Sequence, residues 1–270
     1  MELAVHPGAI ELILGQQKLV VLSALAVPSL AMLLAELVTF LLPFSADVAR
    51  QLARERENSK TIRLDPLVEI SHFDPTIAID SRYATIDNGA RRALYPPQMR
   101  HRCFVRRSVA EQLRRAQISL HQEGYGLKLW DGYRPYTIQW QCADPRVIPD
   151  AAIRRLFAPP NRGSNHARGC AVDITLVELK TGKECVMPTG FDCASPAAAS
   201  NARAGLSREA FRNRRRLQTA LMQADFFTIP AEWWHFNYRP DRTQERSRNA
   251  GDLYLVLDIP FDTLLAAQEP

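Results

Sequence analysis

Residues 164–179 read SNHARGCAVDITLVEL and contain the clearest strand pattern of the chain. From residue 171 onward, apolar side chains alternate with small or polar ones, and this period of two predicts a β-strand. The apolar face of that strand carries Val172, Ile174 and Leu176. Asp173 therefore lies on the opposite face, away from the layer that these apolar residues form.

Two amphipathic helices are predicted, one before and one after this strand. The first covers residues 108–121, with Ser108 and Glu111 as a capping box and Gly124 just beyond its end. Its apolar stripe consists of Val109, Leu113, Ala116 and Leu120. The second helix covers residues 207–224 and begins at a serine, a residue type that favours helix starts.

Short strands complete the pattern. Residues 127–130 follow the first helix, residues 180–183 form a predicted hairpin turn, and an aromatic, strand-like segment, EWWHFNY, lies at residues 232–238. Helices and short strands that do not follow a strict βαβ order indicate an α+β fold. We expect a mainly antiparallel sheet with flanking helices.

Residues 1–46 form an apolar N-terminal segment, which contains the run LVVLSALAVPSLAMLLA at residues 19–35. Three interpretations stay open: an export signal, a membrane anchor through residues 19–44, or an extension with an amphipathic or buried helix. The first two predict a periplasmic or membrane-anchored protein, and a cytoplasmic location is the alternative. A charged linker is predicted over residues 47–61 and the folded domain over residues 62–270.

The net charge of +5 raises the question of a nucleic-acid partner. The basic residues lie mainly in helix-like stretches such as residues 208–216, without the interleaved aromatic side chains of a base-stacking surface. We therefore expect a solvated helix face and no nucleic acid. The five cysteines contain no CxxC pair and indicate neither a zinc ribbon nor a disulfide framework. Cys185 and Cys193 are the closest pair if one bridge forms.

His166 and Asp173, which both lie within residues 164–179, are residue types that bind metal ions. The imidazole precedes a bend at Gly169, the carboxylate lies on the strand that follows, and the small Ala171 leaves room for an ion on that face. Two of the three protein ligands of an open catalytic zinc site can come from here. The same pair is also compatible with a turn-capping histidine and an aspartate in a salt bridge.

Glu232 and His235 supply a second imidazole and a free carboxylate. Residues three apart in a regular strand face opposite sides, so these two share a site only if the chain bends between them. Pro230 favours such a bend. Alone, the segment is more typical of an aromatic cluster with His235 packed on Trp234. Together, the two segments supply the minimal set for metal-assisted amide hydrolysis.

The pattern S-x-H-x-x-G-x-A-x-D, followed about sixty residues later by E-x-W-H, resembles the signature of the zinc D-alanyl-D-alanine dipeptidases, within the zinc D,D-peptidases. Every fixed position of that signature is matched. The resemblance covers roughly residues 62–261. It includes Tyr83-Ala84-Thr85, DGYRP at residues 131–135, Gly190-Phe191-Asp192 and the run at residues 213–217.

The resemblance implies one zinc ion per chain, bound in a central cleft by His166, Asp173 and His235. Glu232 resembles the general base that takes a proton from the attacking water and returns it to the leaving amine. Arg134 resembles the guanidinium that stabilises the oxyanion of the tetrahedral intermediate. The implied reaction is hydrolysis of the small dipeptide D-Ala-D-Ala to two D-alanines.

Three further residues concern the substrate. Asp192 and Tyr83 resemble the groups that recognise the free amino end of the dipeptide, and Ser164 is a candidate partner for its carboxylate. The sequence departs from the family after Tyr83-Ala84-Thr85, because Gly89 follows Asn88 where the family usually continues toward Asn-Phe. We therefore expect the pocket wall near Tyr83 to differ.

Two alternatives stay open. A zinc D,D-carboxypeptidase or a peptidoglycan endopeptidase would apply the same chemistry to longer stem peptides, although Asp192 and the DGYRP loop favour a short dipeptide. A non-catalytic peptidoglycan-binding module would share the fold. A purely structural zinc site, however, fills its fourth position and has no use for a spare carboxylate such as Glu232.

Overall fold

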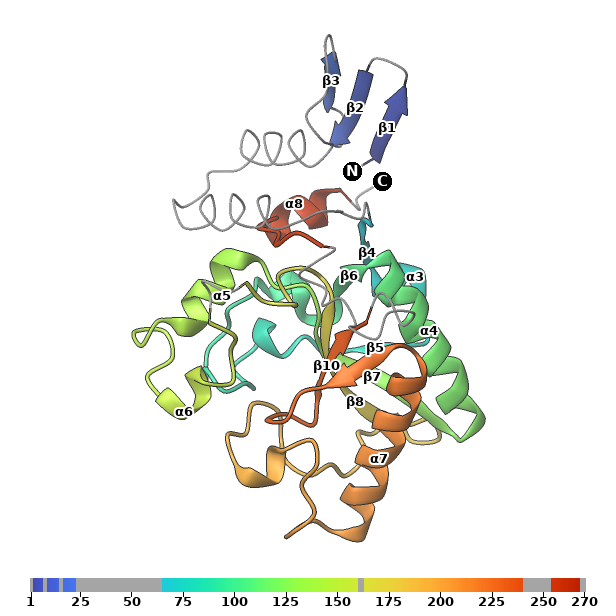
Figure 1. Cartoon of the computed structure of the whole chain (residues 1–270), viewed down its shortest axis with the longest axis vertical. Helices are drawn as coiled ribbons and strands as arrows, with labels where there is room; N and C mark the ends of the chain where they lie inside the picture. Colours follow the sequence, from blue (N-terminus) through green and yellow to red (C-terminus); the bar gives the residue numbers. More distant parts are fainter. Residues whose placement is uncertain are drawn as a thin grey trace. The chain divides into compact units, whose positions relative to one another are not determined.

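The computed structural model describes residues 65–159, 163–239 and 254–267, together with the backbone of three N-terminal strands (Figure 1). The chain divides into two compact units, Asn58–Leu257 and a second unit made of Met1–Glu57 with Asp258–Pro270. The domain boundaries predicted at residues 46 and 61 lie outside the described residues and stay predictions.

The described residues of the unit that contains the N-terminus form a three-stranded antiparallel sheet and one helix. β1 (Glu2–His6), β2 (Ala9–Leu14) and β3 (Gln17–Leu22) pair in the order β1-β2-β3, and α8 spans Phe261–Ala266. The first residues of the apolar run, 19–22, are therefore strand. The rest of that run and the predicted charged linker lie outside the described residues. Within the described part of the chain, no helix is long and apolar enough to cross a membrane.

The larger unit is built around a five-stranded sheet with the strand order β5-β7-β8-β10-β9. These strands are β5 (Ala78–Ile79), β7 (Tyr125–Asp131), β8 (Ala171–Glu178), β9 (Phe226–Thr228) and β10 (His235–Tyr238). β5 runs parallel to β7, and each of the other neighbouring pairs is antiparallel. The predicted α+β fold with a mainly antiparallel sheet is confirmed, and the strand predicted from residue 171 is β8.

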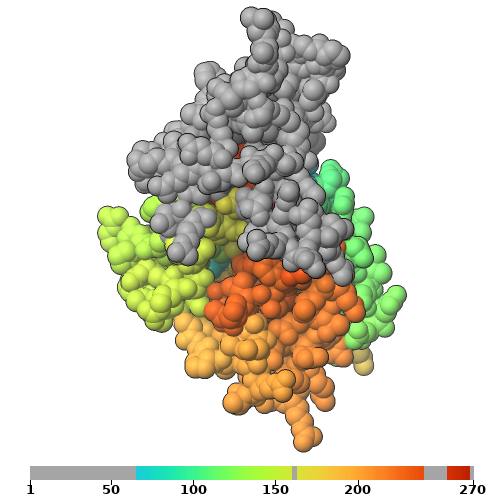
Figure 2. All heavy atoms as spheres, viewed as in Figure 1, coloured from blue at the N-terminus to red at the C-terminus, as the bar shows by residue number. Residues whose placement is uncertain are grey.

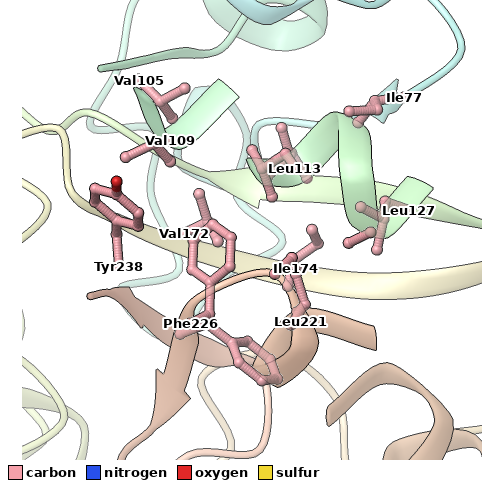
Figure 3. Packing of buried hydrophobic residues seen from close by; sticks show 14 of the residues in the cluster. Ile77, Val105, Val109, Leu113, Leu127, Val172, Ile174, Leu221, Phe226 and Tyr238 are labelled. Atoms are coloured by element: carbon pink, nitrogen blue, oxygen red, sulfur yellow. The ribbon is translucent and has the colours of Figure 1, made fainter. Parts of the chain in front are cut away.

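Helices α4 (Arg107–Gln122) and α7 (Arg208–Gln223) lie side by side along the sheet (Figure 1). The apolar stripe predicted for the first helix is buried, and it packs against Val172 and Ile174 of β8 in one hydrophobic cluster (Figure 3). Figure 3 shows members of this cluster from α4, β7, β8, α7 and β9. The core therefore lies between the two helices and the face of β8 that does not carry Asp173.

The two helices begin in different ways. Ser207 caps α7 as predicted, since its side chain accepts a hydrogen bond at 3.0 Å from the backbone N–H of Ala210. The capping box predicted for α4 is wrong: Arg106 holds the N-cap position without a side-chain cap. Ser108 instead donates its hydroxyl to Asp65 at 2.5 Å, and its backbone N–H to the same carboxylate at 3.3 Å. The partner lies too far away in sequence for a local pattern to indicate it.

Shorter elements complete the larger unit. β4 and β6 form a separate two-stranded antiparallel sheet. The other strands and helices among its described residues are β4 (Leu67–Glu69), α3 (Ile70–Phe73), η1 (Arg82–Ala84), η2 (Pro97–His101), β6 (Phe104–Arg106), α5 (Tyr136–Ala143), α6 (Ala151–Arg154) and η4 (Pro196–Ala198).

A β-bulge near the end of β7 reverses the direction of one side chain. Leu129 pairs with Ile174, but the register then shifts and Asp131 pairs with Asp173. In an unbulged strand Asp131 would share the core face with Leu129, because side chains two apart point the same way. The extra residue turns Asp131 to the face that carries Asp173.

Gly132 follows this bulge at a point where the packing leaves no space for a side chain. An added Cβ would lie 2.5 Å from Cys103 Sγ and 2.7 Å from the carbonyl oxygen of Phe104. Gly132→Ala should therefore lower the free energy of unfolding by about 1–3 kcal/mol, as measured by urea denaturation. Gly190→Ala is the matched control, since a Cβ there meets nothing within 4 Å. Equal stability of the two variants would show that this packing does not constrain the bulge.

Candidate metal centre and active site

The three predicted metal ligands come from adjacent strands and the turn before one of them. Asp173 lies on β8, His235 is the first residue of β10, and the two are paired in register. His166 lies in the turn before β8, where Gly169 has a φ of +70° and reverses the chain. The predicted bend is thus present, and it turns the imidazole toward the strand pair.

The ligand atoms of these three residues converge on one buried point. His166 Nε2 lies 3.1 Å from His235 Nδ1 and 3.4 Å from Asp173 Oδ1, and His235 Nδ1 lies 3.1 Å from the same oxygen. Tetrahedral zinc at its usual bond lengths separates its ligand atoms by about 3.3–3.6 Å. His166, Asp173 and His235 therefore form a group that can hold one metal ion.

Neighbouring acceptors fix which nitrogen of each ring carries its proton. His166 Nδ1 lies 2.7 Å from the carbonyl oxygen of Gly132, and His235 Nε2 lies 3.1 Å from Oδ1 of Asn237. Each of these oxygens accepts a hydrogen bond from the ring nitrogen beside it. In the neutral rings the other nitrogens, His166 Nε2 and His235 Nδ1, therefore present lone pairs toward Asp173. Three electron-rich atoms 3.1–3.4 Å apart repel one another unless a cation lies between them.

When the imidazoles carry a positive charge or donate a hydrogen bond to Asp173, they also act on the charge state of its carboxyl group. Burial alone would raise the pKa of the carboxyl group, but the imidazoles of His166 and His235 reverse that effect and hold its pKa well below the ordinary value. The carboxylate therefore stays ionised at neutral pH and available as a ligand.

Glu232 lies beside the cluster because the chain bends before β10. Residues 233–234 form a bend between β9 and β10, so Glu232 and His235 line the same cavity, as predicted. The His235 ring packs on that of His166, with centroids 4.9 Å apart. No described residue donates a hydrogen bond to the Glu232 carboxylate, and burial raises the pKa of Glu232 to about 8. A carboxyl group with a pKa near neutrality is suited to accepting and donating a proton.

Arg134 brings a buried positive charge to the same region. Its Nη2 lies 2.7 Å from Asp131 Oδ2 and 3.8 Å from Asp173 Oδ2. The guanidinium also lies over the rings of Tyr83 and Phe157, at 4.9 and 5.0 Å from their centroids. Burial disfavours the charge, but Asp131 reverses this and raises the pKa of Arg134 well above its ordinary value.

The predicted substrate-binding residues are also close to the cluster. The Tyr83 hydroxyl donates to both oxygens of Asp192, at 3.2 and 3.0 Å, and the backbone N–H of Gly89 donates to Oδ2 at 3.0 Å. Burial raises the pKa of Asp192 to about 7. Ser164 Oγ accepts from the backbone N–H of His166 at 3.2 Å. The Asn-Gly departure noted in the sequence therefore lies in contact with Asp192.

All eight predicted site residues line one cavity of about 350 Å³. In Figure 2, the yellow-green segment with α5 and α6 and the orange segment leading into β10 border a hollow on the drawn face. These segments contribute residues 155–159 and part of residues 229–237 to the lining. The eight residues are Tyr83, Arg134, Ser164, His166, Asp173, Asp192, Glu232 and His235.

Proteins with sequences similar to this chain include D-alanyl-D-alanine dipeptidases. A family model described as D-ala-D-ala dipeptidase matches residues 63–250. The chain belongs to the D-ala-D-ala dipeptidase family. It is 32% identical over 178 residues to the D-alanyl-D-alanine dipeptidase of Streptomyces coelicolor, covering 60% of this chain and 86% of the relative.

Two further relatives have similar identity. The D-alanyl-D-alanine dipeptidase of Enterococcus faecium is 30% identical over 177 residues, which cover 60% of this chain and 86% of the relative. The D-alanyl-D-alanine dipeptidase of Escherichia coli is 30% identical over 174 residues, which cover 63% of this chain and 83% of the relative.

In this member of the dipeptidase family, Asp131 is a site residue to which the sequence analysis gave no role. It accepts a hydrogen bond at 2.7 Å from the Tyr95 hydroxyl and holds Arg134 through its other oxygen. That second oxygen lies 3.4 Å from His166 Nδ1. Asp131 is the first residue of the DGYRP motif, and its place in that motif could have indicated a role. The direction of its side chain, however, depends on the bulge in β7.

Two amides were also missed. Gln139 on α5 accepts from Arg134 Nη1 at 2.9 Å. Asn237 orients His235 and in turn accepts from Asn165 Nδ2 at 2.7 Å. Asn237 lies two residues after His235 on the same strand face, a spacing that could have indicated it. Nothing in the sequence around Gln139 indicates its contact.

We expect the purified dipeptidase to bind one zinc ion per chain. Adding zinc to chelator-treated protein should raise its melting temperature, because an ion that binds only the native state stabilises it by about 2.7 kcal/mol at one hundred times Kd. His235→Ala should lose stoichiometric zinc, whereas Asn237→Ala should keep it with about 10–100-fold weaker affinity. Metal analysis and calorimetric titration measure both effects. Unchanged zinc affinity in His235→Ala would remove that residue from the ligand set.

Proposed function

We propose that this chain is a zinc-dependent dipeptidase that hydrolyses D-Ala-D-Ala to two D-alanines. The observation that carries the proposal is the convergence of His166, Asp173 and His235, with Glu232 and Arg134 in the same cavity. The D-alanyl-D-alanine dipeptidases that the chain resembles support the substrate class.

Two imidazoles and one carboxylate are a ligand set of open catalytic zinc sites. Bound there, a zinc ion supplies Lewis acidity that polarises a carbonyl and makes water a nucleophile at neutral pH. Glu232 acts as the general base, because its carboxylate lies in the same cavity and accepts no hydrogen bond from the described residues. It takes the proton of the attacking water and passes that proton to the nitrogen of the scissile bond.

Arg134 stabilises the negative charge that develops on the carbonyl oxygen. Asp131 holds the guanidinium in a fixed orientation, and Tyr83 and Phe157 exclude water from its faces. A fixed charge in a buried site stabilises a transition state more than a solvated one does, because it need not reorient during the reaction.

The two charged ends of a free dipeptide match groups on the cavity wall. Asp192 pairs with the ammonium group, with Tyr83 beside it, and Ser164 binds the carboxylate. The cavity of about 350 Å³ lies near the lower end of the range for ligand pockets, about 300–1,000 Å³. This size favours a short peptide over the longer stem peptides of a carboxypeptidase or endopeptidase.

Glu232→Gln should keep zinc and the fold but lose about 10²- to 10⁴-fold in kcat, because general acid-base assistance is removed while the ligands stay in place. Release of D-alanine, measured beside zinc content and melting temperature, tests this. His235→Ala is the comparison, since it should lose zinc as well as activity. A zinc-loaded Glu232→Gln protein with the parent kcat would mean that another group is the base.

N-acetyl-D-Ala-D-Ala should be hydrolysed at least about 100-fold less efficiently than D-Ala-D-Ala, as judged by kcat/KM. The acetyl group removes the ammonium charge and leaves the buried Asp192 without its partner. A chelator should abolish hydrolysis of the free dipeptide, and zinc should restore it. If the free and acetylated substrates react equally well, the chain is a carboxypeptidase and not a dipeptidase.

A further inference from the structure

Asp192 lines two cavities at once. The smaller is the cavity of about 350 Å³ that contains the metal cluster, and the larger has a volume of about 1030 Å³. Among the described residues, Asp192 is the one shared by both linings. The larger cavity is also lined by Arg82, Gly89, Trp130, Thr175 and Phe191.

The Asp192 carboxylate is anchored from both sides. Tyr83, which lines the smaller cavity, donates its hydroxyl at 3.0 Å, and Gly89, which lines the larger, donates its backbone N–H at 3.0 Å. The contact is tight, since a Cβ on Gly89 would lie 2.8 Å from Asp192 Cβ and 2.7 Å from Ile153 Cγ2. We call Asp192, Tyr83 and Gly89 the partition.

The backbone restricts which residues can form this partition. Asp192 has a φ of +54°, in the left-handed region that glycine, asparagine and aspartate adopt most readily. Beside it, Phe191 on the larger cavity packs edge-on against Tyr83 on the smaller, with ring centroids 5.5 Å apart. The aromatic contact supports the side chain that separates the two spaces.

The larger cavity continues along the same face of β8 as the metal cluster. Asp173 lines the smaller cavity, and Thr175, two residues further and on the same face, lines the larger. Thr175 Oγ1 and Asn88 Oδ1 are buried and have no hydrogen-bond partner among the described residues. Trp130 and Phe191 add apolar surface. Polar side chains beside aromatic rings on the lining suit a peptide, which has both amide groups and side chains to offer.

We propose that the larger cavity is a binding site for residues that precede the scissile dipeptide in a longer peptide, and that the partition closes it. This inference rests on the proposed function, in which the amino end of the dipeptide lies against Asp192. A residue attached to that amino group would lie beside Asp192, where the larger cavity begins. The chain is therefore limited to free dipeptides by one side chain, with space for a longer substrate directly behind it.

Two substitutions that both tolerate a positive φ separate the two roles of Asp192. Asp192→Gly removes the Asp192 side chain from the partition, together with its charge. Asp192→Asn removes the charge and keeps the side-chain size. The substrates are D-Ala-D-Ala and Gly-D-Ala-D-Ala, which would be cut to Gly-D-Ala and D-alanine. We expect both variants to lose dipeptide hydrolysis. Asp192→Gly alone should gain at least about tenfold in kcat/KM on the tripeptide.

A third substitution tests whether the gain depends on the larger cavity. Ala152 lines that cavity and does not line the smaller one. Ala152→Trp alone should leave hydrolysis of D-Ala-D-Ala unchanged, but it should cancel the tripeptide gain of Asp192→Gly. Zinc content and melting temperature are measured for every variant. Should Asp192→Gly fail to fold, Asp192→Ala is the second variant that opens the partition, and the same gain is expected of it.

A zinc-loaded, folded variant with an open partition that gains no tripeptide hydrolysis would overturn the inference. So would an equal gain in Asp192→Asn, because that side chain still fills the space. Failure of the proposed function has a different signature: the zinc-loaded parent chain would not hydrolyse D-Ala-D-Ala at all.

Discussion

In their neutral or anionic forms, the three candidate ligand atoms of this site repel one another, and the surrounding structure must hold them together. His166 Nε2, His235 Nδ1 and Asp173 Oδ1 lie 3.1–3.4 Å apart in a buried position, and only a cation makes that spacing favourable. The register between β8 and β10 sets one distance, and the turn at Gly169 sets the others. The sheet therefore acts as the frame that holds these like groups together.

The bulge in β7 links this frame to the second charged group of the cavity. It directs Asp131 toward Arg134 and within 3.4 Å of His166 Nδ1. The residue that follows it, Gly132, supplies the carbonyl oxygen that fixes the His166 tautomer. One local irregularity in a strand thus orients both the imidazole of a candidate metal ligand and the guanidinium of Arg134.

Much of this arrangement could be predicted from the sequence, and the exceptions share a cause. The period-two alternation predicted β8 and the direction of Asp173, and Pro230 indicated the bend that brings Glu232 beside His235. The contact of Ser108 with Asp65, the contact of Gln139 with Arg134 and the direction of Asp131 were missed. Each depends on a tertiary contact or, for Asp131, on a register shift. Local periodicity describes which way a side chain points along its own element, but it carries no information on what lies opposite.

The anchoring of Asp192 has a consequence for how such a protein can diverge. Its hydrogen-bond partners, Tyr83 and Gly89, belong to a segment that supplies none of the candidate metal ligands, whereas those ligands lie on β8, β10 and one turn. The residues that anchor Asp192 and the candidate metal ligands are therefore encoded in separate stretches of the chain. Insertions or exchanges in the connecting segments can change what enters the cavity while the sheet keeps its reactive groups in place.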